Sequence, residues 1–147
     1  MSSLIHLFVY GTLKPGEPNH WVCAEFVVDA YPAIAPGRLY HLPFGYPAMT
    51  LAGSDSVHGY VLTFADLAAL STLDEFEQHC PDTFRRVVPE AIYEENQYSR
   101  QPIHVFNPKR WQVEVAWGYV MTHQQVYALR GVYVPTGNWT AANEYYC

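Results

Sequence analysis

The sequence contains few charged residues, and its basic residues are scattered. Asp, Glu, Lys and Arg make up 15% of the 147 residues, with 8 basic against 14 acidic residues and a formal net charge of −6. The densest basic sites are the pairs Arg85-Arg86 and Lys109-Arg110. Because binding to a phosphate backbone depends on clustered cations, this pattern predicts that nucleic acid is not a partner.

Long apolar runs are also lacking. No stretch approaches the roughly 20 apolar residues that a membrane-spanning helix needs. The first ten residues, MSSLIHLFVY, have neither the basic start nor the small-residue cleavage site of a secretory signal. The three cysteines, Cys23, Cys80 and Cys147, are odd in number and far apart, which argues against a disulfide framework. We therefore predict a cytoplasmic protein that does not enter a membrane.

Several motifs of well-understood chemistry do not occur. The seven histidines show no H-x-x-x-H spacing and no C-x-x-C is present, so no metal site is predicted. No G-x-S-x-G marks a serine nucleophile. The segment GTLKPG resembles the start of a phosphate loop, but Glu17 and Pro18 follow it where that motif requires Lys and Ser or Thr.

The composition is that of a folded, strand-rich protein. Half of the residues are hydrophobic and 16% are aromatic, including 12 tyrosines. Aromatic residues favour strands, and 147 residues fit one domain with its own core. We therefore expect a single domain over residues 1–147.

Apolar patterning predicts strands on both sides of one main helix. Strands are predicted at residues 4–10 and 57–64, and strict alternation over residues 111–121 predicts another strand whose odd-numbered side chains share one face. The helix is predicted from Phe64 to about His79, with Thr63 as its N-cap and Pro81 as its end. Residues 83–94 are expected to be extended, and residues 95–109 to form a polar loop with a short extended piece at residues 103–106. This mixture predicts an α+β fold with a curled sheet or barrel.

The predicted helix carries a carboxylate on its apolar side. At about 100° per residue, Glu77 lies angularly between Leu70 and Leu73. A carboxylate directed at the core is costly unless it is hydrogen-bonded or borders a cavity, and desolvation would raise its pKa into the range of a general acid/base. The alternative is a frayed helix end that leaves Glu77 in solvent or bonded to a backbone amide. Asp74 is interpreted as a structural hydrogen-bond partner and Glu75 as a surface residue.

A loop with little side chain follows the first strand, in the segment FVYGTLKPGEPNH. Its backbone amides near Gly11 are uncluttered and can form a cup for a carboxylate or a carbonyl oxygen. A glycine after a strand also marks an ordinary turn, so both interpretations stay open for this loop taken alone.

Four short motifs, taken together, give a resemblance to a known family. The chain reads YGTL at residues 10–13, GYPA at residues 45–48, LDEFE at residues 73–77 and AWGY at residues 116–119. This ordered set resembles the γ-glutamylcyclotransferase-like superfamily, in particular its AIG2-like and γ-glutamylamine cyclotransferase branch. The resemblance covers most of the chain.

The resemblance implies both a fold and a reaction. The fold is a small β-barrel of mixed strand direction flanked by helices. The reaction is the attack of a γ-glutamyl compound's own α-amine on its γ-carbonyl, which releases 5-oxoproline and a free amine and needs no cofactor. By motif position, Glu77 is the acid/base, and Tyr119 points into the barrel and hydrogen-bonds in the pocket. The backbone amides of the loop hold the glutamyl end of this small-molecule substrate, at Tyr10, Gly11, Thr12 and Leu13.

Three features depart from the family pattern. Gln78 stands where glycine is common, Phe84 stands where tyrosine is common before arginine, and residues 94–109 look like a local elaboration. These changes leave the acid/base in place but bear on the leaving-amine pocket. A non-catalytic binding or interaction module on the same barrel is the main alternative, and a structural barrel with Glu77 on its surface is the third. Tyr and Trp suit a core and an interface equally, so no oligomeric state is predicted.

Overall fold

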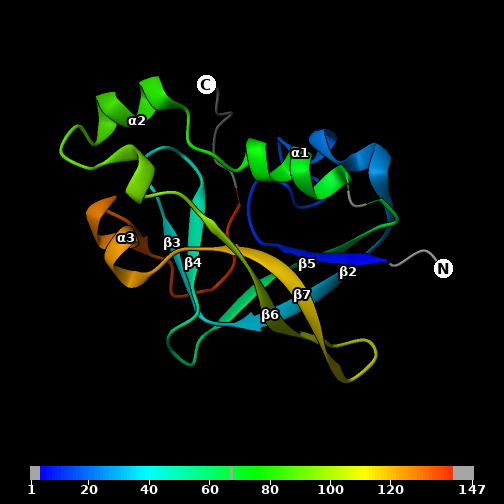
Figure 1. Cartoon of the computed structure of the whole chain (residues 1–147). Helices are drawn as coiled ribbons and strands as arrows, with labels where there is room; N and C mark the ends of the chain where they lie inside the picture. Colours follow the sequence, from blue (N-terminus) through cyan, green and yellow to red (C-terminus); the bar gives the residue numbers. More distant parts are fainter. Residues whose placement is uncertain (1–3, 67, 141–147) are drawn as a thin grey trace.

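A closed five-stranded barrel lies beside a smaller three-stranded sheet in the computed structural model, which describes residues 4–66 and 68–140 (Figure 1). The strands are β1 (Ile5–Val9), β2 (Val27–Pro36), β3 (Arg38–His41), β4 (Pro47–Thr50), β5 (Ser56–Phe64), β6 (Ser99–Asn107), β7 (Gln112–Val120) and β8 (Val132–Tyr133). The helices are α1 (Ala68–Phe76), α2 (Pro81–Val87) and α3 (His123–Ala128), with 3₁₀ turns η1 (His20–Val22), η2 (Ala24–Phe26) and η3 (Tyr93–Glu95). The predicted α+β class is confirmed.

The barrel follows the strand order β1-β5-β2-β6-β7. It closes through the one parallel pair, β1 with β7, where Leu7 lies opposite Trp117, while the other barrel pairs are antiparallel. The strand direction is therefore mixed, as the family resemblance implies. Closure leaves no free barrel edge, and the separate sheet has the order β4-β3-β8.

Three apolar clusters hold these parts together. The first fills the barrel and includes Phe8, Ala33, Ala35, Val57, Val61, Ile103, Val105, Ala116 and Val120. The second lies between the outer face of the barrel and α1 and includes Leu7, Val9, Leu62, Phe64, Leu70, Leu73 and Tyr119. The third joins the small sheet to α2 and α3 through Tyr40, Leu42, Phe44, Phe84, Val126 and Leu129. Helix α1 is thereby fixed against the outside of the barrel, close to β1 (Figure 1).

Helix α1 is shorter than the sequence predicted. Thr63 is not its N-cap, because Thr63 belongs to β5 and pairs with His6 of β1. The Asp66 carboxylate accepts a hydrogen bond of 2.9 Å from the amide of Ala68 instead. Strand pairing across the barrel therefore outweighs the local capping pattern. No helix within the described ranges is long and apolar enough to cross a membrane.

Pro81 begins a helix where the sequence predicted only a helix end. Helix α2 occupies Pro81–Val87, so the expected extended chain is wrong there. Proline is compatible with the first turn of a helix because the amide hydrogen it lacks has no partner at that position. Phe84 is the buried residue of this helix, and the exposed Arg85 and Arg86 lie in its last turn.

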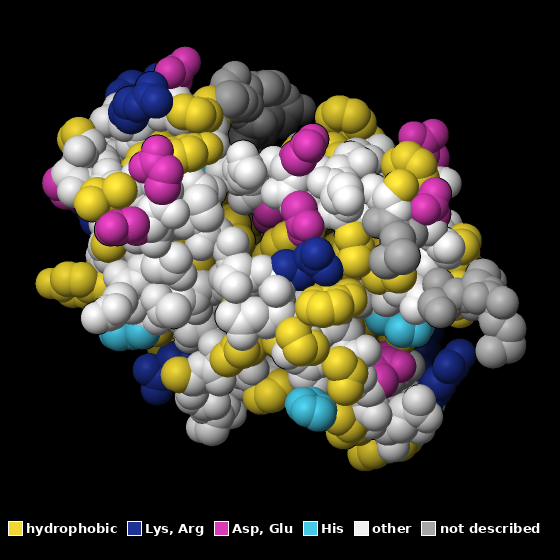
Figure 2. All heavy atoms as spheres, in the orientation of Figure 1, with side chains coloured by type: hydrophobic (Ala, Val, Ile, Leu, Met, Phe, Trp, Pro, Cys, Tyr) yellow, Lys and Arg dark blue, Asp and Glu magenta, His cyan; other side chains and the backbone are white. Residues whose placement is uncertain are grey.

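The segment 95–109 contributes a full barrel strand, not a polar loop with a short extended piece. Strand β6 pairs with β7 along its whole length, from Ser99 opposite Val120 to Asn107 opposite Gln112. The polar appearance arises because only alternate residues of β6 face the core. The strand prediction for β7 is confirmed, but its odd-numbered face points outward, and Val113 and Val115 are 63% and 54% exposed. Figure 2 shows hydrophobic side chains on the outer surface over β6 and β7.

Candidate active site

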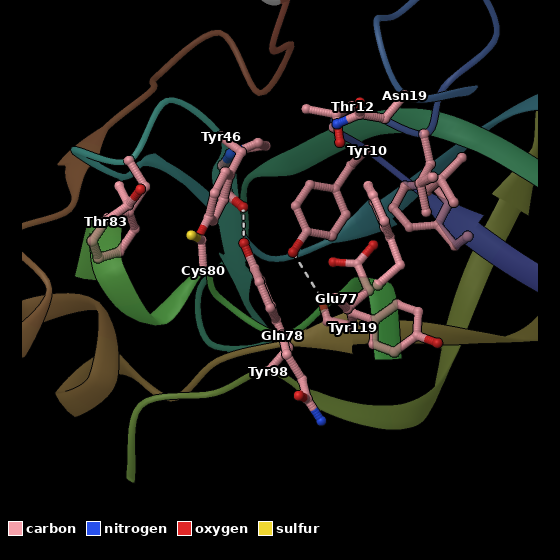
Figure 3. Close-up of a pocket in the computed structure, with 17 residues that line it drawn as sticks. Tyr10, Thr12, Asn19, Tyr46, Glu77, Gln78, Cys80, Thr83, Tyr98 and Tyr119 are labelled. Atoms are coloured by element: carbon pink, nitrogen blue, oxygen red, sulfur yellow. Dashed lines mark hydrogen bonds between the residues drawn. The ribbon is translucent and has the colours of Figure 1, made fainter. Parts of the chain in front are cut away.

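A cavity of about 190 Å³ lies where the end of α1 meets the loop after β1 (Figure 3). Its volume is below the roughly 300 to 1,000 Å³ of drug-sized sites, which favours a ligand of about one amino acid. The cavity brings together all the site residues predicted from the sequence, namely Tyr10, Gly11, Thr12, Leu13, Glu77 and Tyr119.

Glu77 directs its carboxyl into this cavity. It follows the last residue of α1, and its amide donates to the carbonyl of Leu73 (2.9 Å), so the helical backbone continues through it. Figure 3 shows the carboxyl beside the ring of Tyr10. No described residue hydrogen-bonds to this carboxyl, which leaves it open to a ligand. The alternatives of a frayed helix end and of a surface carboxylate far from the Gly11 loop are therefore wrong.

The environment of Glu77 favours its neutral form. Burial, and after it the negative charge of Asp74 one turn earlier, raises the pKa of the Glu77 carboxyl to about 8. The sequence prediction of an upward shift is confirmed. A carboxyl that titrates near neutrality can both take a proton and return it, which is the requirement for a general acid/base.

The same shift predicts a pH-dependent stability. Folded Glu77 keeps a proton that an unfolded glutamate loses near pH 4.3. Its stabilising contribution is thus complete below about pH 4 and is lost as the pH rises to about 8. Over this window we expect the free energy of unfolding to fall by up to about 1.4 kcal/mol per pH unit from this group, and Glu77→Gln should remove that slope. Urea unfolding at several pH values measures it, with Glu75→Gln on the exposed face of α1 as control. Parallel wild-type and Glu77→Gln profiles would contradict the prediction.

The loop after β1 presents backbone donors to the cavity. Among the described residues, none accepts a hydrogen bond from the amides of Gly11, Thr12 or Leu13. The loop is nevertheless fixed, because the amide of Lys14 donates to the carbonyl of Gly11 (3.1 Å) and that of Asn19 to the carbonyl of Thr12 (3.0 Å). A fixed loop with three unused donors suits a carboxylate or a carbonyl oxygen.

Gly11 allows this loop to approach β4 closely. A Cβ atom at Gly11 would lie 2.8 Å from Cγ and 2.9 Å from Cδ of Pro47, which is closer than real side-chain contacts. The absence of a side chain at this position is therefore required by packing as well as being useful to a ligand.

The Tyr10 hydroxyl links three strands at the wall of the cavity. Its hydroxyl donates to the carbonyl of Tyr119 (2.7 Å) and accepts from the amide of Met49 (3.1 Å), which joins β1 to β7 and β4. Burial raises the pKa of Tyr10, so the hydroxyl keeps its proton. The ring of Tyr10 thus lines the cavity while its hydroxyl holds the walls in place.

Tyr119 reaches the cavity from outside the barrel. The implied orientation into the barrel is wrong, because Ala116 and Val120 fill the interior while Tyr119 packs against α1. Its hydroxyl donates to Oδ1 of Asp74 (2.6 Å). Asp74 also accepts from Nε (2.9 Å) and Nη2 (3.2 Å) of Arg100, which confirms its interpretation as a structural partner.

Two tyrosines of the cavity wall were missed by the sequence argument. The Tyr98 hydroxyl donates to the carbonyl of Pro47, and Tyr98 lies in the segment interpreted as an elaboration. The Tyr46 hydroxyl bonds to Nδ1 of His79, whose Nε2 lies 2.7 Å from the carbonyl of Asn96. Burial lowers the pKa of His79 to about 4, so the imidazole is neutral and orients Tyr46. Tyr46 belongs to the GYPA motif, which was the available signal.

The cysteines differ from each other in state. Cys23 is a buried free thiol, whereas Cys80 at the cavity wall is disulfide-bonded, which the sequence argument did not expect. Cys147 lies outside the described residues. Within the described part of the chain, no group of three or more His, Cys, Asp or Glu side chains is placed to hold a metal ion.

Comparisons with known proteins agree on one family. The family model described as "Gamma-glutamyl cyclotransferase, AIG2-like" matches residues 7–141. Gamma-glutamylaminecyclotransferase B of Danio rerio is 35% identical over 95 residues, and the Mus musculus gamma-glutamylaminecyclotransferase is 30% identical over 95 residues. Each match covers 56% of this chain, and 47% and 60% of the two relatives. The matched part of the chain thus spans about half of the length of these curated relatives.

Solved structures show the same fold at lower identity. An AIG2-like protein from Mus musculus is 22% identical, with a TM-score of 0.59 over 98% of this chain and 88% of its own. YkqA from Bacillus subtilis is 23% identical, with a TM-score of 0.63 over 95% of this chain and 40% of its own.

Proposed function

Since the chain belongs to the AIG2-like γ-glutamyl cyclotransferase family, we propose that it is an enzyme that converts a γ-glutamyl amide into 5-oxoproline and a free amine, with Glu77 as the general acid/base. The observation that carries this proposal is the shared cavity, in which the unbonded Glu77 carboxyl meets a loop with three unused amide donors. The proposal keeps a cytoplasmic location and independence from a cofactor as predictions.

Substrate binding is assigned to the loop after β1. The unused amides of Gly11, Thr12 and Leu13 can donate hydrogen bonds to the carboxylate or the carbonyl oxygen of a glutamyl group. Holding both ends of that group in a folded pose places the α-nitrogen next to the γ-carbonyl. For a reaction within one molecule, such positioning supplies a large part of the acceleration.

Glu77 is assigned the proton transfers. Its carboxylate takes a proton from the α-ammonium group, and the freed amine attacks the γ-carbonyl carbon to close a five-membered ring. Glu77 then returns the proton to the leaving nitrogen as the original C–N bond breaks. Two protons move in all from the α-nitrogen, which keeps one hydrogen in 5-oxoproline, to the leaving nitrogen, which departs as an ammonium group. Glu77 relays both and ends as it began.

A direct assay tests this function. The purified chain is incubated with a panel of γ-glutamyl amides, and 5-oxoproline is measured by chromatography with mass detection. Formation of 5-oxoproline supports the enzyme. Thermal stabilisation by a γ-glutamyl compound without any product would instead favour the non-catalytic binding module.

The raised pKa of Glu77 predicts how kcat/KM changes with pH on the acid side of its profile. Because the reactive form needs an ionised Glu77, kcat/KM should rise about tenfold per pH unit below about pH 8 and level off near it. The negative charge of Asp74 contributes to the raised pKa, so Asp74→Asn should move this limb to lower pH. Rates between pH 5.5 and 9.5 measure both effects. A profile that is flat from pH 6 to 8 would contradict the assignment of Glu77.

A further inference from the structure

Four tyrosines line the cavity, and three of them visibly give their hydroxyl hydrogen to a fixed group of the protein. Tyr10 and Tyr98 donate to backbone carbonyl oxygens, and Tyr119 donates to a carboxylate oxygen (2.6 Å). The fourth hydroxyl, that of Tyr46, bonds to an imidazole nitrogen, which could in principle be a donor or an acceptor. The direction of this fourth bond decides what the hydroxyl can offer to a ligand.

His79 fixes the direction of the bond to Tyr46. Its Nε2 lies 2.7 Å from the carbonyl oxygen of Asn96, and since a carbonyl only accepts, Nε2 carries the hydrogen. Burial lowers the pKa of His79 to about 4, so the imidazole is neutral and Nδ1 has no hydrogen. Nδ1 therefore accepts, and the Tyr46 hydroxyl donates to it. The rings of Phe44 and Phe84, with centres 5.1 and 5.4 Å from that of the imidazole, hold His79 in this position.

The Tyr46 oxygen is left as a pure acceptor. A tyrosine hydroxyl has one hydrogen, and burial raises the pKa of Tyr46, so this hydrogen stays on the oxygen and is used by His79. Among the described residues, none donates a hydrogen bond to the hydroxyl of Tyr46 or of Tyr98. Towards a ligand, these two oxygens can therefore accept a hydrogen bond but cannot donate one.

These acceptors lie on the side of the cavity that faces Glu77. The rings of Tyr46 and Tyr98 are neighbours, with centres 6.5 Å apart, and Figure 3 shows both beside the Glu77 carboxyl. After burial, the charge of Glu77 is the largest contribution to the raised pKa of Tyr46, which agrees with this closeness. The loop after β1 offers donors at the other side of the same cavity. A ligand group next to Glu77 and Tyr46 must therefore present N–H or O–H.

We propose that Tyr46 binds an N–H of the substrate's α-nitrogen next to Glu77, and that His79 is the positioning residue that makes Tyr46 an acceptor. This inference rests on the proposed function, because the α-nitrogen is the group from which Glu77 takes a proton. Once that proton has left, the amine keeps two N–H groups. An acceptor that holds one of them turns the nitrogen lone pair towards the γ-carbonyl carbon, which is the orientation that ring closure needs.

A matched pair of ring compounds tests the acceptor without any turnover. 5-Oxoproline and its lactone analogue, 5-oxotetrahydrofuran-2-carboxylate, differ only in a ring N–H against a ring oxygen. Calorimetry at pH 6.5 measures both dissociation constants, at a pH where Glu77 is protonated and its neutral carboxyl can donate to one ring or accept from the other. Tyr46 can only accept, so we expect the lactone to bind at least about tenfold more weakly.

Three variants separate the role of His79 from a structural one. His79→Phe keeps an aromatic ring in place but removes the acceptor, so the Tyr46 hydrogen can turn to the lactone oxygen. The lactone should then bind more tightly and the ratio of the two constants should fall about two- to tenfold, the value of one neutral hydrogen bond. Tyr46→Phe should lower the ratio by weakening 5-oxoproline. The control is Tyr93→Phe, whose hydroxyl donates to the backbone carbonyl of His79 outside the cavity and should leave the ratio unchanged.

The outcomes distinguish this inference from the proposed function. Equal binding of both rings by the wild type, or no binding of 5-oxoproline, would overturn Tyr46 as an acceptor. A ratio that survives in Tyr46→Phe would also overturn it, and equal weakening of both rings in His79→Phe would reduce His79 to a structural residue. Selective binding without formation of 5-oxoproline from any γ-glutamyl amide would refute the proposed function alone. The wild-type comparison needs no variant, so a folding defect in His79→Phe does not prevent the test.

Discussion

Replacing Glu77 with glutamine is expected to lower 5-oxoproline formation by at least about a hundredfold, the lower end of what a positioned acid/base contributes. Glutamine keeps the shape of the side chain but has no proton to exchange at neutral pH. Since the Glu77 carboxyl has no hydrogen-bond partner among the described residues, this exchange removes no structural bond. The loss should therefore appear in kcat, with substrate affinity largely kept.

The matched control for this experiment is Glu75→Gln. Glu75 is exposed on the opposite side of α1 and has the same length and charge as Glu77. Its replacement should leave turnover close to the wild-type value, and circular dichroism should show the native fold in both variants. A Glu77→Gln variant that turns over like the wild type would remove Glu77 from the reaction, whatever the cavity holds.

The sequence was sufficient to predict six residues that the fold brings together in the cavity, although it missed Tyr46 and Tyr98. Glu77 and the loop from Tyr10 to Leu13 lie far apart in the chain, and neither periodicity nor composition places them side by side. Four short motifs in a fixed order predicted that they lie together, because the motifs resemble those of a known family. The matched family model confirms that resemblance. The roles of these residues stay predictions, as does the single domain over residues 1–147.

The structure corrected those sequence-based predictions that depend on how the strands pack in the folded protein. The alternation around Tyr119 predicts a strand but not which face meets the barrel, because both faces of β7 carry apolar residues. The segment containing Tyr98 and Arg100 reads as a polar loop, since its outward residues are polar and only alternate residues enter the barrel. Tyr98 and Arg100 line a hollow together with Glu77, so part of the segment that was predicted to be a polar loop lies beside the candidate site.

Replacing Gly11 with alanine is expected to lower kcat/KM by about a hundredfold, as a displacement of about 1 Å at a reacting centre can do. The added Cβ would lie 2.8 Å from Cγ of Pro47, so either the loop or β4 must move. The loop carries the unused amides, and β4 is held through the bond from the Tyr98 hydroxyl to the carbonyl of Pro47. We therefore expect the loop to shift and its donors to leave the position of the glutamyl group.

A second substitution separates this displacement from a general loss of stability. Pro47→Ala removes the Cγ and Cδ atoms that the new side chain would meet. In a double-mutant cycle, Gly11→Ala combined with Pro47→Ala should therefore be more active than the product of the two single effects predicts, by about tenfold or more, since residues in contact couple. Independent effects of the two substitutions, in variants that fold normally, would show that Gly11 serves the reaction in some way other than its close approach to Pro47. Full activity of Gly11→Ala alone would show that the position of these amides does not matter, and the assignment of the loop as the glutamyl site would fall.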